Sequence, residues 1–272
     1  MERLVYTASN GEKVSLEGHM FWSGIAEKVR SHEWNYTLEN KNAYGLVMLA
    51  SERDLDYTAD YETANRLRNL ADRDISYGSP GIISLDNWKQ RCYIVGNSVS
   101  EVHSERIQGT IRLLLLDGFW HKTNSKVFYG GATAPVGIDY PYDYDYDYGF
   151  YAGNNSLTVD ASIPAPCKIT FFGATTDPYI SIGGNRYELD VSVVDGAQGV
   201  IDGTGSRPTA YILDSLGNRQ NVFAQAVRDG GINGGSYAFK PLDPGLSNVS
   251  WGATFTVEVE WEERESEPIW KL

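Results

Sequence analysis

Hydrophobic and polar residues alternate along much of this chain, which is the pattern of β-strands. Successive side chains of a strand point to opposite faces, so a strand with one buried face reads as period two. Asn10 and Gly11 separate two such stretches, and this dipeptide favours the tight turn of a β-hairpin. The strands predicted in the first half are residues 4–7, 13–16, 32–39, 45–50, 81–85, 91–95 and 107–116.

Two neighbouring stretches of the first half are strongly apolar. Trp34, Tyr36 and Leu38 occupy every second position and predict a half-buried strand. Residues 45–50 form a continuous apolar run, which predicts a strand buried on both faces. We therefore expect both segments inside the core.

One segment of the chain has helical spacing. Apolar side chains recur there at steps of three and four residues, which gives one apolar helix face, and Gly78–Gly81 ends it. The apolar positions are Tyr57, Tyr61, Ala64, Leu67, Leu70 and Ala71. We predict a helix over residues 57–74, packed on a sheet, so that the first part of the chain is an α+β domain.

The second half reads as β structure without a helix. Short apolar stretches alternate with turn signals, which indicates a sandwich or barrel. The predicted strands are residues 156–159, 168–172, 179–182, 187–194, 199–202, 209–213 and 254–261. In the last of these, Phe255, Val257, Val259 and Trp261 are expected to point inward. The acidic run 262–267 is expected to be a solvated tail.

Residues 138–151 differ in composition from the rest of the chain. Tyrosine and aspartate alternate there, so an extended segment would place the tyrosines on one side and the aspartates on the other. Asp143, Asp145 and Asp147 resemble the start of a calcium loop, but Asn154 stands where the bidentate glutamate belongs. We interpret the segment as a connecting strap with a packed aromatic side. The predicted domains are 1–136 and 154–272, joined by a linker at 137–153.

Charge and cysteine content exclude several roles. The chain of 272 residues carries a formal net charge of −13, which disfavours direct contact with a nucleic-acid backbone. Cys92 and Cys167 are the only cysteines and fall in different predicted domains, which favours free thiols in a reducing compartment. The sequence shows neither a signal peptide nor a membrane span, so we expect a protein made in the cytoplasm.

The sequence contains no recognisable catalytic or cofactor motif. His19, His32, His103 and His121 lack a second metal ligand at suitable spacing. Residues 103–105 are interpreted as a loop, Cys92 as a buried structural thiol, and Glu258 and Glu260 as a solvated sheet face. We therefore predict no catalytic, cofactor-binding or metal-binding residue, and no enzyme.

A carbohydrate-binding or adhesin protein is the alternative that the composition leaves open. Trp251 and Tyr237 lie before the last strand and could stack on a sugar of a host cell-wall glycan. A core or interface role for the two rings is the simpler interpretation.

Taken in order, the motifs of the chain resemble the distal tail protein (Dit) family of long-tailed phages and prophages. The resemblance rests on the opening hairpin, the single helix near Thr58, the tyrosine- and proline-rich segment, and a series of turn motifs. The matching segments are residues 4–11, 117–120, 140–144, 163–166, 172–173, 177–180, 199–202, 217–218, 223, 244–245 and 267–270.

The resemblance implies a structural protein of the virion. Members of the family form homo-hexameric rings through an N-terminal belt domain, and their C-terminal domain is a galectin-like β-sandwich. The ring joins the tail tube protein to the tail tip or baseplate and anchors the tail-associated lysin or fibre and receptor-binding proteins. DNA passes through the lumen without specific binding. A member of this family is assembled in the host cytoplasm and needs no membrane or cofactor.

Overall fold

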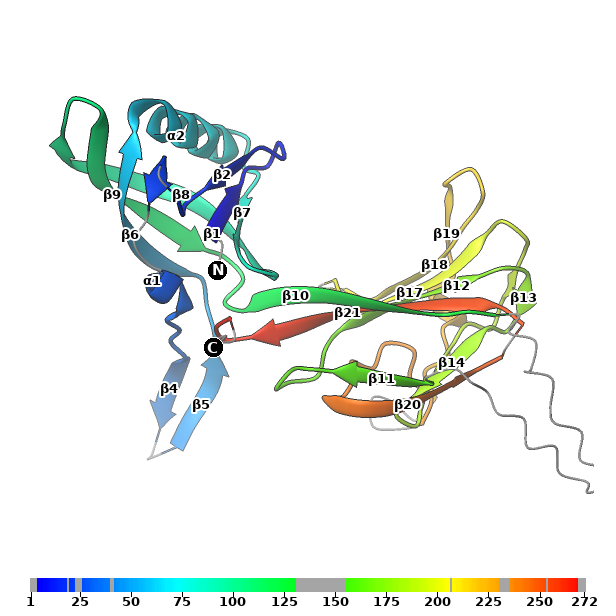
Figure 1. The fold of residues 1–272 in the computed structure, drawn as a ribbon. Coiled ribbons are helices and arrows are strands. Elements are labelled where there is room, and N and C mark those ends of the chain that lie inside the picture. The colour runs from blue at the N-terminus through cyan, green and yellow to red at the C-terminus, as the bar shows by residue number, and fades with distance from the viewer. Residues whose placement is uncertain are drawn as a thin grey trace, which may run out of the picture. The chain divides into compact units, whose positions relative to one another are not determined.

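The computed structural model describes residues 4–18, 20–22, 26–39, 42–130, 155–205, 207–229, 235–252 and 254–268. Within these residues the protein is mostly β structure, with one long helix and several antiparallel sheets (Figure 1). The chain divides into two compact units, Met1–Lys122 with Arg264–Leu272, and Thr123–Glu263. The predicted strap at 138–151 and the predicted domain limits around it lie outside the described residues.

The first unit contains a sheet of antiparallel strands. Its order is β2-β1-β7-β8-β9-β6-β3. The strands are β1 (Leu4–Thr7), β2 (Lys13–Ser15), β3 (Phe21–Trp22), β6 (Ser51–Asp60), β7 (Gly81–Leu85), β8 (Trp88–Val102) and β9 (Arg106–Leu115). β1 pairs with β2 across the predicted turn, where Gly11 adopts a φ of +87°, a conformation that glycine adopts without strain. The hairpin prediction is confirmed.

Helix α2 (Tyr61–Ser76) packs on this sheet, but it starts four residues later than predicted. Leu55, Tyr57 and Ala59 belong to β6, where period two places all three in the core. Asp60 then caps the helix by accepting a hydrogen bond from the backbone N–H of Thr63 at 2.7 Å. Tyr57 fits both the two-residue period of β6 and the three- and four-residue spacing of α2. Sequence spacing alone therefore predicted a helix that starts too early.

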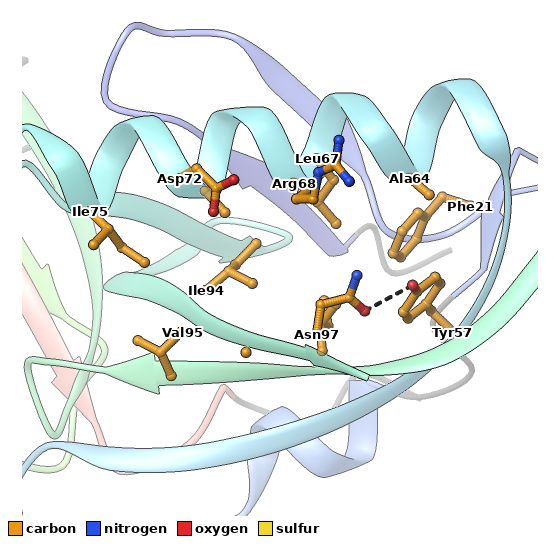
Figure 2. A pocket seen from close by; sticks show the side chains of 13 residues that line it. Phe21, Tyr57, Ala64, Leu67, Arg68, Asp72, Ile75, Ile94, Val95 and Asn97 are labelled. Carbon is orange, nitrogen blue, oxygen red and sulfur yellow. Dashed lines mark hydrogen bonds between the residues drawn. The ribbon is translucent and has the colours of Figure 1, made fainter. Parts of the chain in front are cut away.

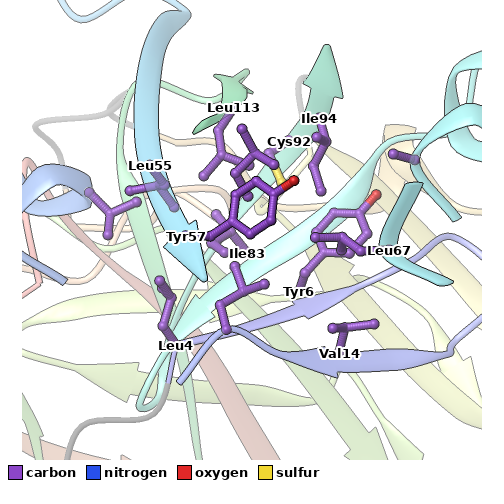
Figure 3. Packing of buried hydrophobic residues seen from close by; sticks show 14 of the residues in the cluster. Leu4, Tyr6, Val14, Leu55, Tyr57, Leu67, Ile83, Cys92, Ile94 and Leu113 are labelled. Carbon is purple, nitrogen blue, oxygen red and sulfur yellow. The ribbon is translucent and has the colours of Figure 1, made fainter. Parts of the chain in front are cut away.

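The core of the first unit lies between α2 and the sheet (Figure 3). Leu4, Leu55, Ile83 and Leu113 are fully buried there, each on a different strand. Ala64, Leu67, Leu70 and Ala71 of α2 face the same core, as the spacing predicted. Burying large aliphatic side chains contributes roughly 1.5–3 kcal/mol each, so this layer holds the unit together.

The two apolar segments expected in the core form an exposed hairpin instead. β4 (Asn35–Glu39) pairs with β5 (Asn42–Val47), and every residue of β4 is exposed. The predictions of a half-buried strand at 32–39 and a buried strand at 45–50 are therefore wrong. Their patterns match buried strands, but the described residues include no layer that covers them.

The end of the chain contacts the beginning within the first unit. Arg30, at the end of helix α1 (Ala26–Arg30), is 2% exposed, and its Nη1 donates to the backbone oxygen of Pro268 at 2.5 Å. His32 Nδ1 lies 3.6 Å from a carboxylate oxygen of Glu267. A buried guanidinium requires such partners because an uncompensated buried charge is costly.

The second unit consists of antiparallel strands in two main sheets and one short pair. One sheet has the order β19-β18-β17-β12-β21-β10, another β11-β20-β14-β15, and β13 pairs with β16. The strands are β10 (Trp120–Phe128), β11 (Ser156–Val159), β12 (Cys167–Phe172), β13 (Thr175–Thr176), β14 (Tyr179–Ile182), β15 (Asn185–Glu188), β16 (Ser192–Val193), β17 (Gln198–Asp202), β18 (Thr209–Leu213), β19 (Arg219–Asn221), β20 (Gly245–Trp251) and β21 (Thr256–Glu265). The chain passes from the first unit to the second within β10 and back within β21.

The last strand confirms one prediction and corrects another. Phe255, Val257, Val259 and Trp261 are buried as the alternation predicted. The strand continues into the acidic run, where Glu263 is 1% exposed and accepts hydrogen bonds from the indole Nε1 of Trp261 and the backbone N–H of Asp160. The expectation of a fully solvated tail is therefore wrong at Glu263.

Candidate assembly surface

The β4–β5 hairpin presents large apolar side chains to solvent. Leu38 pairs with Ala43 and Thr37 with Tyr44, and directly opposed residues share a face of the hairpin. Tyr36 and Leu38 therefore lie on one face, where they are 57% and 67% exposed. The other face carries Tyr44, which is also exposed.

The base of this hairpin is attached to the body of the first unit. The ring of Trp34 contacts the ring of Phe119 edge-on, with centroids 5.8 Å apart. An isolated two-stranded hairpin is marginally stable at best in water. Exposed apolar faces of this kind are typical of protein interaction sites.

A second exposed feature is the far end of β8 and β9. β7 pairs with β8 only as far as Cys92, whereas β9 pairs with it as far as Val102. In the described part of the chain, β8 beyond Cys92 thus has one edge without a strand partner. Val99 and Val102 are exposed here. Unpaired edges of this length readily accept a strand from another chain.

The outer face of β6 and β9 carries paired charges. Asp54 accepts a hydrogen bond from Arg112 Nε at 2.8 Å, directly across the two strands. Asp56 accepts from Lys28 at 2.6 Å and from Thr110 at 2.7 Å. These hydrogen bonds lower the pKa values of both aspartates below the usual range, because they favour the ionised carboxylates. On this solvated face, the cationic side chains thus lie beside carboxylates.

A groove of about 280 Å³ lies between α2 and the strands below it (Figure 2). Most of the residues that line it are apolar, and Arg68, Asp72 and Asn97 are polar. Phe21, Tyr57, Ala64, Leu67, Ala71, Ile94 and Ile111 line the interior, and Arg68, Asp72, Ile75, Val95, Gly96 and Asn97 complete the wall. The Tyr57 hydroxyl donates to Asn97 Oδ1 at 2.9 Å, and burial raises the pKa of this tyrosine. This hydrogen-bonded pair and the side chains of Arg68 and Asp72 thus add polar groups to a mainly apolar recess.

The residues considered for catalysis are not assembled into a site. His103, Ser104 and Glu105 form the exposed loop between β8 and β9, as predicted, with His103 Nε2 3.2 Å from a carboxylate oxygen of Glu101. Glu258 and Glu260 lie on the partly exposed face of β21, and Glu260 pairs with Lys168. His19 lies outside the described residues.

Both cysteines are buried free thiols. Burial raises the pKa of Cys92 to about 12 and that of Cys167 to about 12, which leaves neither as a nucleophilic thiolate at neutral pH. The prediction of a buried structural thiol at Cys92 is confirmed. Among the described residues, no cluster of three or more His, Cys, Asp or Glu side chains is placed to hold a metal ion, and no helix could span a membrane. Asp143, Asp145 and Asp147 of the predicted strap lie outside the described residues.

The aromatic side chains considered for sugar stacking pack against the core of the second unit. The ring of Trp251, at the end of β20, lies 5.3 Å from the ring of Phe128. The side-chain amide of Asn185 accepts a hydrogen bond from the backbone N–H of Tyr237 and donates one to its backbone carbonyl. The ring of Tyr237 packs edge-on against the ring of Phe239. Both side chains are half-buried.

Comparison with protein-family models and with curated protein sequences finds no match. Solved structures do match over almost the full length. The Dit protein of phage SPP1, described as a paradigm of the hub adsorption apparatus in phages that infect Gram-positive bacteria, superimposes with a TM-score of 0.59 at 11% identity. The match covers 97% of this chain and 99% of that one.

A chain of the phage P2 baseplate in its activated conformation matches similarly. With Ca the TM-score is 0.54 at 8% identity, and with Sr it is 0.56 at 9% identity. Each match covers 98% of this chain and 100% of the other. The resemblance to the distal tail protein family is thus confirmed at the level of the fold.

Proposed function

We propose that this chain is a structural protein of a phage tail, the distal tail ring at the hub of the baseplate. The observation that carries the proposal is the nearly complete mutual coverage with the SPP1 Dit protein, which leaves neither chain with a large additional part.

In this proposal six copies form the ring through the belt domain, which corresponds to the first unit. The ring joins the tail tube to the tail tip and anchors the lysin or fibre and the receptor-binding proteins. The exposed hairpin and the open edge of β8 support this role, because the described residues leave both surfaces uncovered. A closed ring repeats one such heterologous contact by rotation.

The galectin-like sandwich predicted over residues 154–272 is proposed to project as an attachment arm, with residues 137–153 as the strap before that sandwich. The net charge of −13 agrees with a lumen that DNA crosses without binding. No direct contact with a base or a lipid forms part of this role.

Light scattering coupled to size-exclusion chromatography, followed by negative-stain microscopy, tests the proposal. We expect rings of six copies, either from the purified chain at high concentration or in the presence of its tail tube protein. A protein that stays monomeric under both conditions would contradict the proposed function.

A further inference from the structure

Gln90 places a polar side chain in a row of otherwise apolar residues on β8. Trp88, Gln90, Cys92 and Ile94 occupy alternate positions of the strand, so their side chains share one face. All four are buried, and Gln90 is 3% exposed. A buried amide costs free energy unless its polar atoms make hydrogen bonds. Within the described residues, Oε1 of Gln90 has no hydrogen-bond donor.

Arg53 on β6 presents a second buried polar atom of this kind. Its Nη1 donates to the backbone oxygen of Glu52 and its Nη2 to that of Ser31, each at 2.7 Å. These two bonds hold the guanidinium in one orientation. Its Nε is buried as well, and in the described part of the chain this N–H has no acceptor.

Gln90 and Arg53 line the same small cavity. Its volume is about 10 Å³, and the atoms that face it are mostly polar. This is the space that one water molecule needs, and a polar cavity of that size is suited to hold one. A polyatomic ion or an organic ligand is too large for it.

The two atoms also specify the chemistry of what the cavity binds. Oε1 of Gln90 can only accept a hydrogen bond, and the Nε–H of Arg53 can only donate one. The bound species must therefore donate to the first and accept from the second. A cation would face the charge of the guanidinium, and an anion would face the amide oxygen. Water does both at once and carries no charge.

The cavity lies at the base of the β4–β5 hairpin. Residues 31–33, which lead into β4, and residues 48–49, which follow β5, line it together with Gly118 and Trp120. Gln90 belongs to the central part of the sheet, between β7 and β9. A molecule in the cavity therefore contacts the sheet and both segments that carry the hairpin.

We propose that this cavity binds one water molecule, which donates a hydrogen bond to Oε1 of Gln90 and accepts one from Nε of Arg53. The water joins the core strand β8 to the base of the hairpin and is part of that attachment. All residues that line the cavity belong to the first unit, so the inference does not depend on the proposed ring.

A crystal structure of the full chain, at a resolution that shows ordered water, tests the site directly. We expect one oxygen atom at about 2.7–3.2 Å from both Oε1 of Gln90 and Nε of Arg53. Anomalous data collected at long wavelength distinguish water from chloride. A direct bond between the two side chains, another protein group in the cavity, an ion, or no density there would each overturn the inference.

Gln90→Met tests the same site in solution. The substitution keeps the approximate length of the side chain and removes its polar atoms. With water bound, it removes a hydrogen bond, and the melting temperature should fall by about 2–4 °C. Without water, it removes an unpaired buried amide, and the melting temperature should rise. An unchanged or higher melting temperature therefore overturns the inference.

Gln220→Met is the matched control, because Gln220 is exposed on β19. It should shift the melting temperature by about 1 °C or less. Neither experiment depends on assembly. A protein that stays monomeric but holds the water contradicts the proposed function alone, and a ring without the water contradicts this inference alone.

Discussion

The hydroxyl of Tyr6 on β1 donates a hydrogen bond to Asp74 Oδ2 of α2 at 2.5 Å, across 68 positions of sequence. Both side chains are fully buried. The other carboxylate oxygen accepts hydrogen bonds from the N–H and the hydroxyl of Ser9, at 3.1 Å and 2.6 Å. One carboxylate thus fixes the end of the long helix to the first hairpin.

Replacing Asp74 should destabilise the first unit strongly. Asp74→Ala leaves the Tyr6 hydroxyl and two donors of Ser9 without acceptors, and we expect a loss of about 2–3 kcal/mol of unfolding free energy. Asp72→Ala, on an exposed position of the same helix, should change it by no more than about 0.5 kcal/mol. Urea unfolding followed by fluorescence measures both, and equal effects would show that the buried network contributes nothing specific.

Alkaline conditions should destabilise the protein before they affect its exposed groups. Burial raises the pKa of Cys92 and of Cys167 from 9.0 to about 12, so each folded thiol holds its proton more tightly than the unfolded one. Their contribution to stability is complete below pH 9 and is lost as the pH rises toward 12. The pKa of Tyr6 is also raised, mainly by burial and then by the bond to Asp74, and adds to the loss at higher pH.

Melting temperatures measured by circular dichroism between about pH 8 and pH 11 should therefore fall from about pH 9 onward. A Cys92→Ala, Cys167→Ala variant should show a flatter curve between about pH 9 and pH 10, where the thiols titrate before the tyrosines. Parallel curves for the two proteins would argue against the thiols as the cause.

Gly118 should tolerate a side chain less well than Gly78. Both have positive φ, +72° and +61°, but a Cβ at Gly118 would lie 2.5 Å from the backbone oxygen of Met48, whereas one at Gly78 would meet nothing within 4 Å. We expect Gly78→Ala to cost about 1 kcal/mol from backbone strain alone and Gly118→Ala clearly more. Thermal unfolding of the two variants, side by side, measures the difference, and an equal cost would mean that the backbone at Met48 moves away freely.

Trp251 should matter for stability rather than for sugar binding. Trp251→Ala removes a ring packed on Phe128, and we expect a loss of about 3 kcal/mol from the second unit. Leu246→Ala, on an exposed position of the same strand β20, should have an effect within about 0.5 kcal/mol. A Trp251 variant that keeps its melting temperature but loses binding to cell-wall glycans would favour the carbohydrate-binding alternative instead.

Several elements were predictable because their signals are local. The Asn10–Gly11 hairpin depends on the conformations of a few neighbouring residues, and the alternation of β21 depends on the pleat of one strand. Helix α2 was predictable in type and apolar face but not in its start, because Tyr57 fits both the strand period and the helix period. β20 carries exposed residues on most of its length, so its hydrophobic pattern is weak.

The sequence by itself determined that this is a β-rich chain with one principal helix, that Cys92 is a buried structural thiol, and that its ordered motifs resemble distal tail proteins. Only the tertiary structure decided which apolar segments are buried. Residues 32–39 and 45–50 have the patterns of core strands, yet Asn35–Glu39 and Asn42–Val47 form a hairpin that the described residues leave exposed. Glu263 lies in an acidic run, yet it is buried against Trp261. Burial depends on what distant segments bring to a side chain, and the local pattern contains no information about those segments.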